Sequence, residues 1–208
     1  GYELSPGGLA FAREEWHTAI EGAYVLMSDA LWISHPHRLR DAAHQPLQHL
    51  LANKLGLTTP RTLITNDPDA AAEFTVLCRG KITAQPVSAG WLSPEKSGMS
   101  YMLKGRAEGE PMAIDDLWVS PIALQEVLPR AYKIKVNVVG QQALAIRNDS
   151  PERSIANLGR PRARSKAQAY LPYDLPDALE QQCITLTHKL GLEFATLDLI
   201  RKQDGEYV

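Results

Sequence analysis

The sequence predicts an α+β fold, with helix–strand units early in the chain and an antiparallel sheet late. Two observations lead to this fold class. Residues 9–29 carry apolar side chains at helical spacing, which predicts a long amphipathic helix. Residues 132–139 alternate apolar and polar side chains up to Gly140, which predicts a half-buried strand that turns into a hairpin with residues 143–146.

The other expected elements follow from apolar patterns and from helix and strand breakers. Asp67 and Pro68 are residues typical of the N-cap and the first position of a helix. Residues 148–169 are polar, basic and interrupted by Pro and Gly, which predicts a loop. The remaining elements are helices at residues 40–55, 68–74 and 172–190, and strands at residues 31–33, 62–65, 81–85, 101–103, 123–128 and 194–200, followed by a turn at residues 204–205.

Composition limits the classes of partner. The chain has 208 residues and a net charge of −2, which speaks against nucleic acid or a membrane surface as a partner. The two cysteines, Cys78 and Cys183, lie in unrelated segments, which favours the reducing cytoplasm. There is no signal peptide at the N-terminus, and Val208 follows a strand-like start, so we expect the chain to be the middle of a longer protein.

Residues 82–90 form the most informative stretch for function. β-branched residues lead into Pro86 and a run of small residues, which is typical of a strand feeding a flexible loop that covers phosphate groups. Such a site favours a cation at the strand end, because phosphate oxygens bind charged donors most strongly. The side chain in that place is the neutral amide of Gln85.

Several segments, in register, resemble a known family. The segments are residues 31–36, 46–48, 56–57, 60–68, 125–129, 131–140, 191–194, 198–200 and 204–205. Together they resemble ATP-grasp ligases that mature ribosomally made peptides, namely the graspetide or microviridin-type macrocyclases and their actinobacterial relatives.

This resemblance implies an ATP-grasp fold, in which two α/β lobes hold a nucleotide in a cleft between antiparallel sheets. Residues 1–32 are expected to end the region before the ATP-grasp domain, and residues 33–208 to form that domain. Within it, residues 60–125 correspond to the lid lobe. Residues 126–208 correspond to an incomplete C-terminal lobe.

The resemblance also implies a reaction and its partners. The relatives use ATP and Mg²⁺ to activate a side-chain carboxylate of a precursor peptide as an acyl phosphate, which a Thr, Ser or Lys of the same peptide then attacks. An active protein would be an ATP-dependent carboxylate–amine or carboxylate–alcohol ligase. An acidic precursor peptide is the implied partner, and family members often form homodimers.

The family's site residues map onto this chain with clear departures. Gln45 and Gln85 stand where the family has phosphate-binding lysines, and Lys133 and Lys135 stand where a Glu–Arg pair is usual. Asp198 matches the first magnesium-binding acid. The other magnesium ligands, a Glu and an Asn, would follow the last residue of the chain, and the family's Asp-Trp-Arg motif is not found in residues 148–169.

The adenine contact is expected from the main chain of the segment that links the two lobes. This contact needs backbone groups rather than particular side chains, so it tolerates sequence change. The segment consists of Gln125, Glu126, Val127 and Leu128.

These departures leave two functions open. Loss of two charge-assisted phosphate contacts weakens nucleotide binding on the order of 100-fold. The chain is then either a ligase with weak nucleotide binding or a catalytically inactive relative, a pseudoenzyme, that binds a peptide or a partner enzyme.

Each site residue also has an ordinary structural interpretation. Gln45 and Gln85 are then surface amides, and Asp198 is a buried acid paired with a nearby cation. Cys78 beside Arg79 suggests an activated thiol, although no histidine partner is apparent. Four histidines at irregular spacing are polar surface residues or, less simply, zinc ligands; they are His35, His37, His44 and His49.

The basic residues of the expected loop have three interpretations. They form a solvated loop, a binding site for an acidic peptide, or a nucleic-acid contact that the near-neutral net charge disfavours. The arginines in question are Arg153, Arg160, Arg162 and Arg164.

Overall fold

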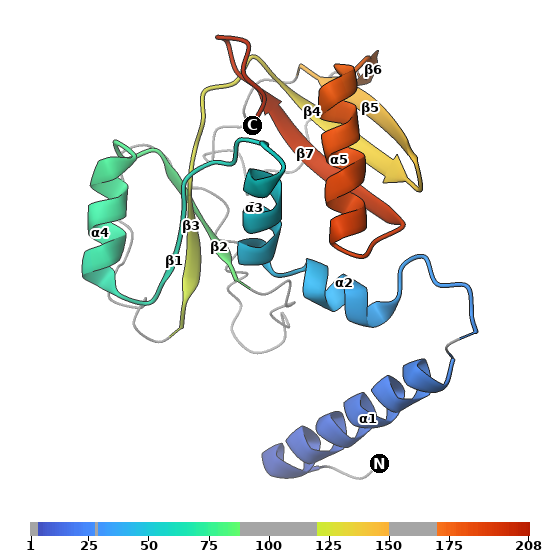
Figure 1. The fold of residues 1–208 in the computed structure, drawn as a ribbon. Helices are drawn as coiled ribbons and strands as arrows, with labels where there is room; N and C mark the ends of the chain where they lie inside the picture. The colour runs from blue at the N-terminus through green and yellow to red at the C-terminus, as the bar shows by residue number, and fades with distance from the viewer. Residues whose placement is uncertain (1–3, 28, 88–119, 150–169) are drawn as a thin grey trace, which may run out of the picture.

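The computed structural model describes residues 4–27, 29–87, 120–149 and 170–208 (Figure 1). The expected strand at residues 101–103 and the basic loop with Arg153, Arg160, Arg162 and Arg164 lie outside these ranges. The described elements are α1 (Pro6–Leu26), α2 (Pro36–Ala42), α3 (Gln45–Lys54), β1 (Thr62–Thr65), α4 (Pro68–Leu77), β2 (Ile82–Pro86), β3 (Ile122–Glu126), β4 (Tyr132–Val139), β5 (Gln142–Asn148), β6 (Tyr170–Tyr173), α5 (Asp177–Lys189) and β7 (Phe194–Arg201).

The first lobe is a three-stranded antiparallel sheet in the order β1-β3-β2, with α4 against one face. Asp67 caps α4, accepting a hydrogen bond from the N–H of Asp69 at 3.0 Å, and Pro68 opens the helix as expected. The side chains of α4 and of the sheet form one apolar core. Its residues are Ala71, Phe74, Cys78, Ile82, Ala84, Ile122 and Leu124.

The second lobe is a four-stranded antiparallel sheet in the order β6-β5-β4-β7. The predicted alternation of β4 is confirmed, because Ile134, Val136 and Val138 are buried while the residues between them are not. The buried side chains pack against α5. Gly140 makes the β4–β5 turn with a φ of 55°, a conformation that favours glycine.

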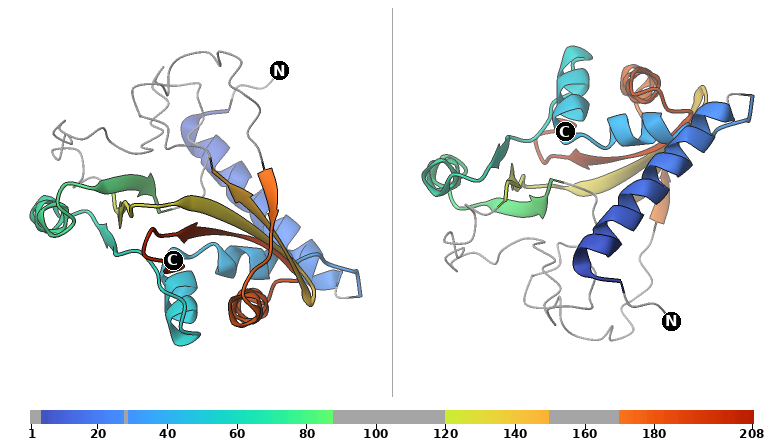
Figure 2. Two further views of the ribbon diagram at one scale, coloured as in Figure 1. Left: turned by 90° about the horizontal axis from the view of Figure 1, so that it is seen from above. Right: turned by 90° about the horizontal axis from the view of Figure 1, so that it is seen from below.

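Two helices lie on one side of the four-stranded sheet. Figure 2 shows α3 and α5 on the same side of the four-stranded sheet, while α4 lies beyond the three-stranded sheet. Each sheet therefore has one face covered by a described helix. The other face of each sheet is called its open face below.

The expected strand at residues 31–33 is wrong. Leu31 is 90% exposed and Ile33 is 71% exposed, and no described strand pairs with them. Trp32 alone is held, with its ring 5.6 Å from that of Tyr24 in an edge-to-face contact. Three apolar residues without a neighbouring strand cannot satisfy the backbone of a buried strand.

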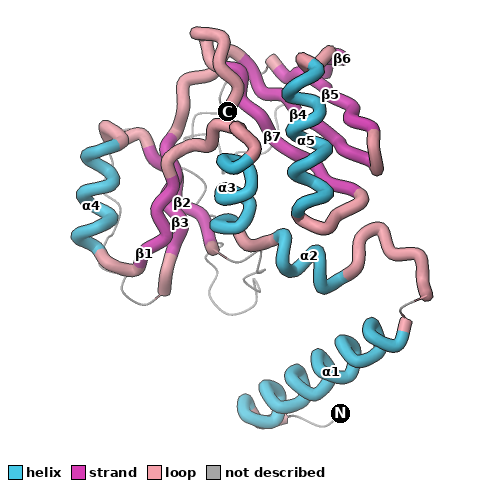
Figure 3. Tube along the Cα trace, in the orientation of Figure 1, coloured by secondary structure: helices cyan, strands magenta, loops and turns pink. Residues whose placement is uncertain are grey.

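The expected helix at residues 40–55 is two helices, α2 and α3, joined by a short connection (Figure 3). Pro46 explains the break, because its ring clashes with the preceding turn of a continuous helix and its nitrogen has no hydrogen to donate. Pro46 instead lies in the first turn of α3, where that missing donor does no harm.

The expected helix at residues 172–190 begins later, and its first residues belong to β6. Two prolines favour extended backbone before the helix. Pro172 lies opposite Ile146 on an edge strand, which is where a sheet tolerates proline, and Pro176 immediately precedes α5.

The expected strand at residues 194–200 is present but is only partly buried, since it forms an edge of the described sheet. The turn at residues 204–205 is confirmed, with Gly205 at a φ of 95°. The chain then returns along β7, where Ile200 and Val208 exchange two backbone hydrogen bonds of 2.7 and 2.9 Å.

α1 projects from the rest of the described chain, and none of its residues is buried (Figure 1). An ion pair between Glu21 and Arg40 joins it to α2. None of the described helices combines the length and apolar character needed to cross a membrane.

We expect Leu124→Ala to lower the free energy of unfolding by about 2–5 kcal/mol, because Leu124 is fully buried under α4 and its truncation leaves a cavity. Urea unfolding followed by circular dichroism measures this loss. The matched control is Leu144→Ala on an exposed position of β5, which should change stability by about 0.5 kcal/mol or less. Equal losses in both variants would contradict the core assignment.

Candidate functional site

Gln85 and Gln125 lie on the open face of the three-stranded sheet. Gln85 pairs with Ala123 across β2 and β3, and Gln125 is two residues further along β3, so both side chains share one face. Gln125 Nε2 donates to Thr62 Oγ1 at 3.4 Å. The paired strand positions of this face therefore present neutral amide and hydroxyl side chains.

The segment that links the lobes uses some of its backbone groups within the sheet. The N–H of Glu126 donates to the carbonyl of Arg61 at 2.9 Å, and the N–H of Val127 donates to that of Lys81 at 2.8 Å. Among hydrogen bonds between described residues, none involves the N–H of Leu128. The expected contact of this segment with adenine stays a prediction.

The open face of the four-stranded sheet carries a ladder of polar side chains on β4 and β7. Lys135 lies opposite Asp198, and Asn137 lies opposite Thr196. Lys135 Nζ is 3.2 Å from Asp198 Oδ1, and Thr196 Oγ1 donates to Asn137 Oδ1 at 2.8 Å. Lys133 is on the same face, one rung further along β4.

The alternative that Asp198 is a buried acid paired with a cation is half right. Its side chain is 74% exposed and so is not buried, but Lys135 does pair with it. A single exposed carboxylate held by an ammonium group is a poor site for Mg²⁺, which prefers several oxygen ligands in octahedral geometry. Among the described residues, no three His, Cys, Asp or Glu side chains gather around a common point. The described residues therefore do not fit a bound magnesium ion.

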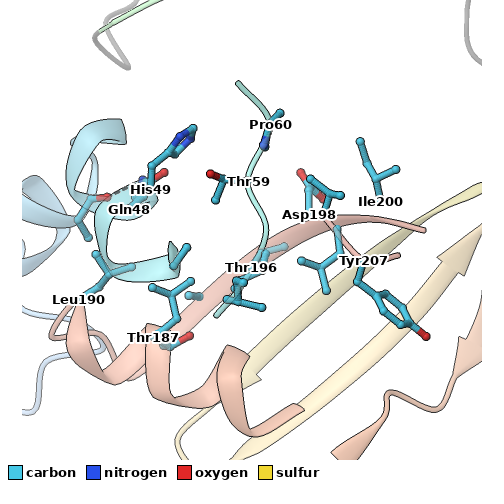
Figure 4. Close-up of a pocket in the computed structure, with 18 of the residues that line it drawn as sticks. Gln48, His49, Thr59, Pro60, Thr187, Leu190, Thr196, Asp198, Ile200 and Tyr207 are labelled. Atoms are coloured by element: carbon cyan, nitrogen blue, oxygen red, sulfur yellow. Dashed lines mark hydrogen bonds between the residues drawn. The ribbon is translucent and has the colours of Figure 1, made fainter. Parts of the chain in front are cut away.

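A cavity of about 700 Å³ lies between the lobes at the edge of β7 (Figure 4). Gln125, Lys133 and Asp198, which are far apart in the sequence, all line it. The rest of the wall is mainly apolar and comes from α2, α3, residues 57–60, α5 and β7. The cavity therefore brings together Gln125, from the segment that links the lobes, and Asp198.

His49 of α3 is part of the same wall. Burial lowers the pKa of His49 below its usual 6.5, because a charged imidazole loses hydration there. His49 therefore remains neutral at pH 7 and can accept or donate a hydrogen bond in the cavity. The sequence alone did not single it out from the other histidines.

Gln45 lies away from the cavity wall, in the first turn of α3. Its Oε1 atom is buried, and no described group donates a hydrogen bond to it. A buried acceptor without a donor is unfavourable by about 1–3 kcal/mol, so this amide is poorly satisfied in the described structure. It is therefore not an ordinary surface amide, and its role at phosphate stays a prediction.

Cys78 belongs to the core of the first lobe and has no disulfide partner. Burial and, to a smaller extent, the carboxylate of Glu126 raise the pKa of the Cys78 thiol. A raised pKa keeps the thiol protonated, which argues against an activated nucleophile at this position.

Solved structures similar to this chain are ATP-grasp ligases of modified peptides. The macrocyclase MdnB from Microcystis aeruginosa MRC is 27% identical, with a TM-score of 0.75 over 100% of this chain. The macrocyclase MdnC of the same source, bound with its precursor peptide MdnA, is 23% identical with a TM-score of 0.78 over 98% of this chain.

A ligase from Chryseobacterium gregarium extends this set. It is 20% identical, with a TM-score of 0.73 over 98% of this chain, and its structure contains ADP with a leader and core peptide. No protein-family model and no curated protein sequence matches the chain. The chain spans 63%, 62% and 61% of the lengths of MdnB, MdnC and the Chryseobacterium ligase, respectively.

The chain therefore has the ATP-grasp fold, in the form found in ligases that modify ribosomally made peptides. The resemblance expected from the sequence motifs and the expected α+β fold class are both confirmed by these structures.

We expect Gln85→Lys to strengthen ATP binding about 10-fold, because an ammonium group on the open face would make a charge-assisted contact with phosphate. Titration calorimetry in the presence of magnesium measures the dissociation constant for ATP of the variant and of the unaltered chain. We expect the unaltered chain to bind weakly. Gln181→Lys on the exposed side of α5 adds the same charge away from the cavity and should leave affinity unchanged. Micromolar binding by the unaltered chain would contradict this account of Gln85.

Proposed function

We propose that this chain is the nucleotide- and peptide-binding core of an ATP-grasp ligase that acts on ribosomally made peptides. The observation that carries the proposal is its similarity to the macrocyclase MdnB over 100% of its own length. Related structures contain a precursor peptide in MdnC, and ADP with leader and core peptides in the Chryseobacterium ligase. These are the ligand classes we assign to the cavity between the lobes.

In the proposed reaction, a peptide side-chain carboxylate attacks the terminal phosphorus of ATP, which forms an acyl phosphate and releases ADP. A hydroxyl or amine of the peptide then attacks the acyl carbon, loses its proton and displaces inorganic phosphate. In this scheme the main chain of Leu128 contacts adenine, and Lys133 and Lys135 supply positive charge near the phosphates. Magnesium would neutralise phosphate charge when bound, but the described residues do not fit it.

A second function, as a non-catalytic relative that binds a peptide or a partner enzyme, is favoured by specific observations. Gln45 and Gln85 remove two cations from the expected phosphate contacts. The Lys135–Asp198 ion pair occupies the carboxylate that a catalytic metal would use. Such a protein keeps the fold and its recognition surfaces without the phosphoryl-transfer chemistry.

The domain division follows the same proposal. Residues 1–32 precede the ATP-grasp domain at residues 33–208, with the lid lobe at residues 60–125 and the C-terminal lobe at residues 126–208. We assign the protein to the cytoplasm, where a reduced Cys78 and Cys183 are expected and where ribosomally made precursors are available.

We further propose that α1 joins two copies of the chain into a homodimer. Leu9, Trp16 and Ile20 follow one another at helical spacing along one side of α1, the C-cap residue Met27 continues this spacing, and all four are exposed. Trp16 is 70% exposed. A long apolar stripe of this kind marks an interaction surface, because soluble proteins rarely leave large apolar patches in water.

Trp16→Glu should convert a dimer into a monomer, since it places a charge in the middle of the apolar stripe of α1. Sedimentation velocity at micromolar protein concentration measures the mass. Thr18→Glu on the opposite side of α1 is the matched control and should remain dimeric. A wild-type chain that is monomeric at these concentrations would refute the role of α1.

Pull-down with an immobilised acidic peptide tests the peptide-binding proposal. We expect about 10-fold more protein to be retained by a peptide rich in Asp and Glu than by its Asn and Gln counterpart, because of charge complementarity with the basic segment. Replacing Arg153, Arg160, Arg162 and Arg164 by Gln should abolish the difference. Retention that grows with ATP favours the ligase, and retention independent of ATP favours the binding module. Equal retention on both peptides would contradict an acidic partner.

A further inference from the structure

The charges on the open faces of the two sheets are distributed differently from those that the family resemblance implies. At the paired strand positions of β2 and β3, the open face of the three-stranded sheet carries Thr83, Gln85, Ala123 and Gln125, none of which is a cation. The open face of the four-stranded sheet carries Lys133 and Lys135 against one acid, Asp198. Among these strand positions, the cations are therefore on β4 rather than on β2 or β3.

The geometry of β4 and β7 brings Lys135 and Asp198 close together. The N–H of Gly140 donates to the carbonyl of Glu193 at 2.8 Å, and such bonded pairs alternate with non-bonded pairs along the ladder. The register makes Lys135 and Asp198 a non-bonded pair, in which side chains approach most closely. The 3.2 Å ion pair is thus built into the strand register.

The two lysines have a spacing suited to a chain of phosphates. Lys133 and Lys135 are two residues apart on one strand, so their Cα atoms are separated by about 7 Å and their side chains leave the same face. The Lys135 side chain is 45% exposed, which leaves its ammonium group accessible to a ligand. Lysine is a common phosphate-binding side chain because its ammonium acts as a compact point charge.

We propose that Lys135 and Lys133, on the open face of the four-stranded sheet beside the cavity, bind the phosphate chain of a nucleotide without a divalent cation, and that Asp198 holds Lys135 when no phosphate is bound. This inference rests on the proposed nucleotide site. The ammonium group of Lys135 lies beside Asp198. In this proposal it supplies the positive charge that a metal ion would otherwise bring. Asp198 and an incoming phosphate compete for the same ammonium group.

This competition gives Asp198 an effect of opposite sign from that of a metal ligand. Replacing a magnesium ligand weakens nucleotide binding, and the loss appears only when magnesium is present. Replacing the partner of Lys135 instead releases its charge and removes a repulsive carboxylate from the site. Asp198→Asn should therefore strengthen binding, in the absence of metal as well as in its presence.

The experiment titrates the whole chain with ATP and, separately, with inorganic tripolyphosphate, at one fixed ionic strength. Each titration is made with magnesium and with a chelator, and is followed by protein amide shifts in nuclear magnetic resonance to millimolar ligand. Tripolyphosphate separates phosphate recognition from adenine recognition. Both side chains of the ion pair are exposed, so single substitutions there should leave the fold intact.

For the unaltered chain, we expect dissociation constants for both ligands that agree within about twofold with and without magnesium. Lys135→Gln should weaken binding about 10-fold, and Asp198→Asn should strengthen it about threefold or more. The matched controls remove the same charges elsewhere: Lys189→Gln at the end of α5 and Glu73→Gln on α4 should both bind as the unaltered chain does.

Two results would overturn the inference. Binding that requires magnesium and is weakened by Asp198→Asn would identify Asp198 as a metal ligand, and would leave the proposed nucleotide site intact. No binding of either ligand under any condition would refute both the phosphate site and the nucleotide part of the proposed function. Peptide retention in the pull-down would then distinguish the non-catalytic module from a protein with neither activity.

Discussion

The antiparallel register between β4 and β7 is the constraint on which the functional part of the structure depends. Because side chains alternate along a strand, one register decides both faces at once. It directs Ile134, Val136 and Val138 toward α5, where they form the core of the second lobe. The same register directs Lys135 onto Asp198 on the opposite face. A shift by one residue would bury the charges and expose the core, so stability of the sheet preserves the geometry of the site.

The two lobes have separate cores and meet at one cavity. Each has its own apolar core, one under α4 and one under α5, so each holds its strands independently. The cavity at the edge of β7 lies where the lobes meet, and Gln125 from one lobe and Asp198 from the other both line it. Sites between lobes suit ligands that bridge them, because movement of one lobe changes the contacts without disturbing either core. This arrangement agrees with a nucleotide and a peptide as ligands.

The distribution of charge in this chain differs from the one that the family resemblance implies. Gln85 lies on the open face of the three-stranded sheet, at a position where the resemblance implies a cation. Lys135 and Asp198 form an ion pair, although they are 63 positions apart in the sequence. The alternation of residues 132–139 already indicated that Lys133, Lys135 and Asn137 share a face. The alternation did not indicate that β7 is the strand that pairs with β4 on this side.

The sequence by itself determined the ATP-grasp fold, the alternation of β4, the cap of α4 and the turns at Gly140 and Gly205, because these depend on local backbone preferences and on motifs read in order. Only the tertiary structure decided that residues 31–33 form no strand, that β7 is half exposed, and that His49 lies in a cavity wall. Those properties depend on which elements pack against one another, and burial and pairing between distant segments leave no local signal in the chain.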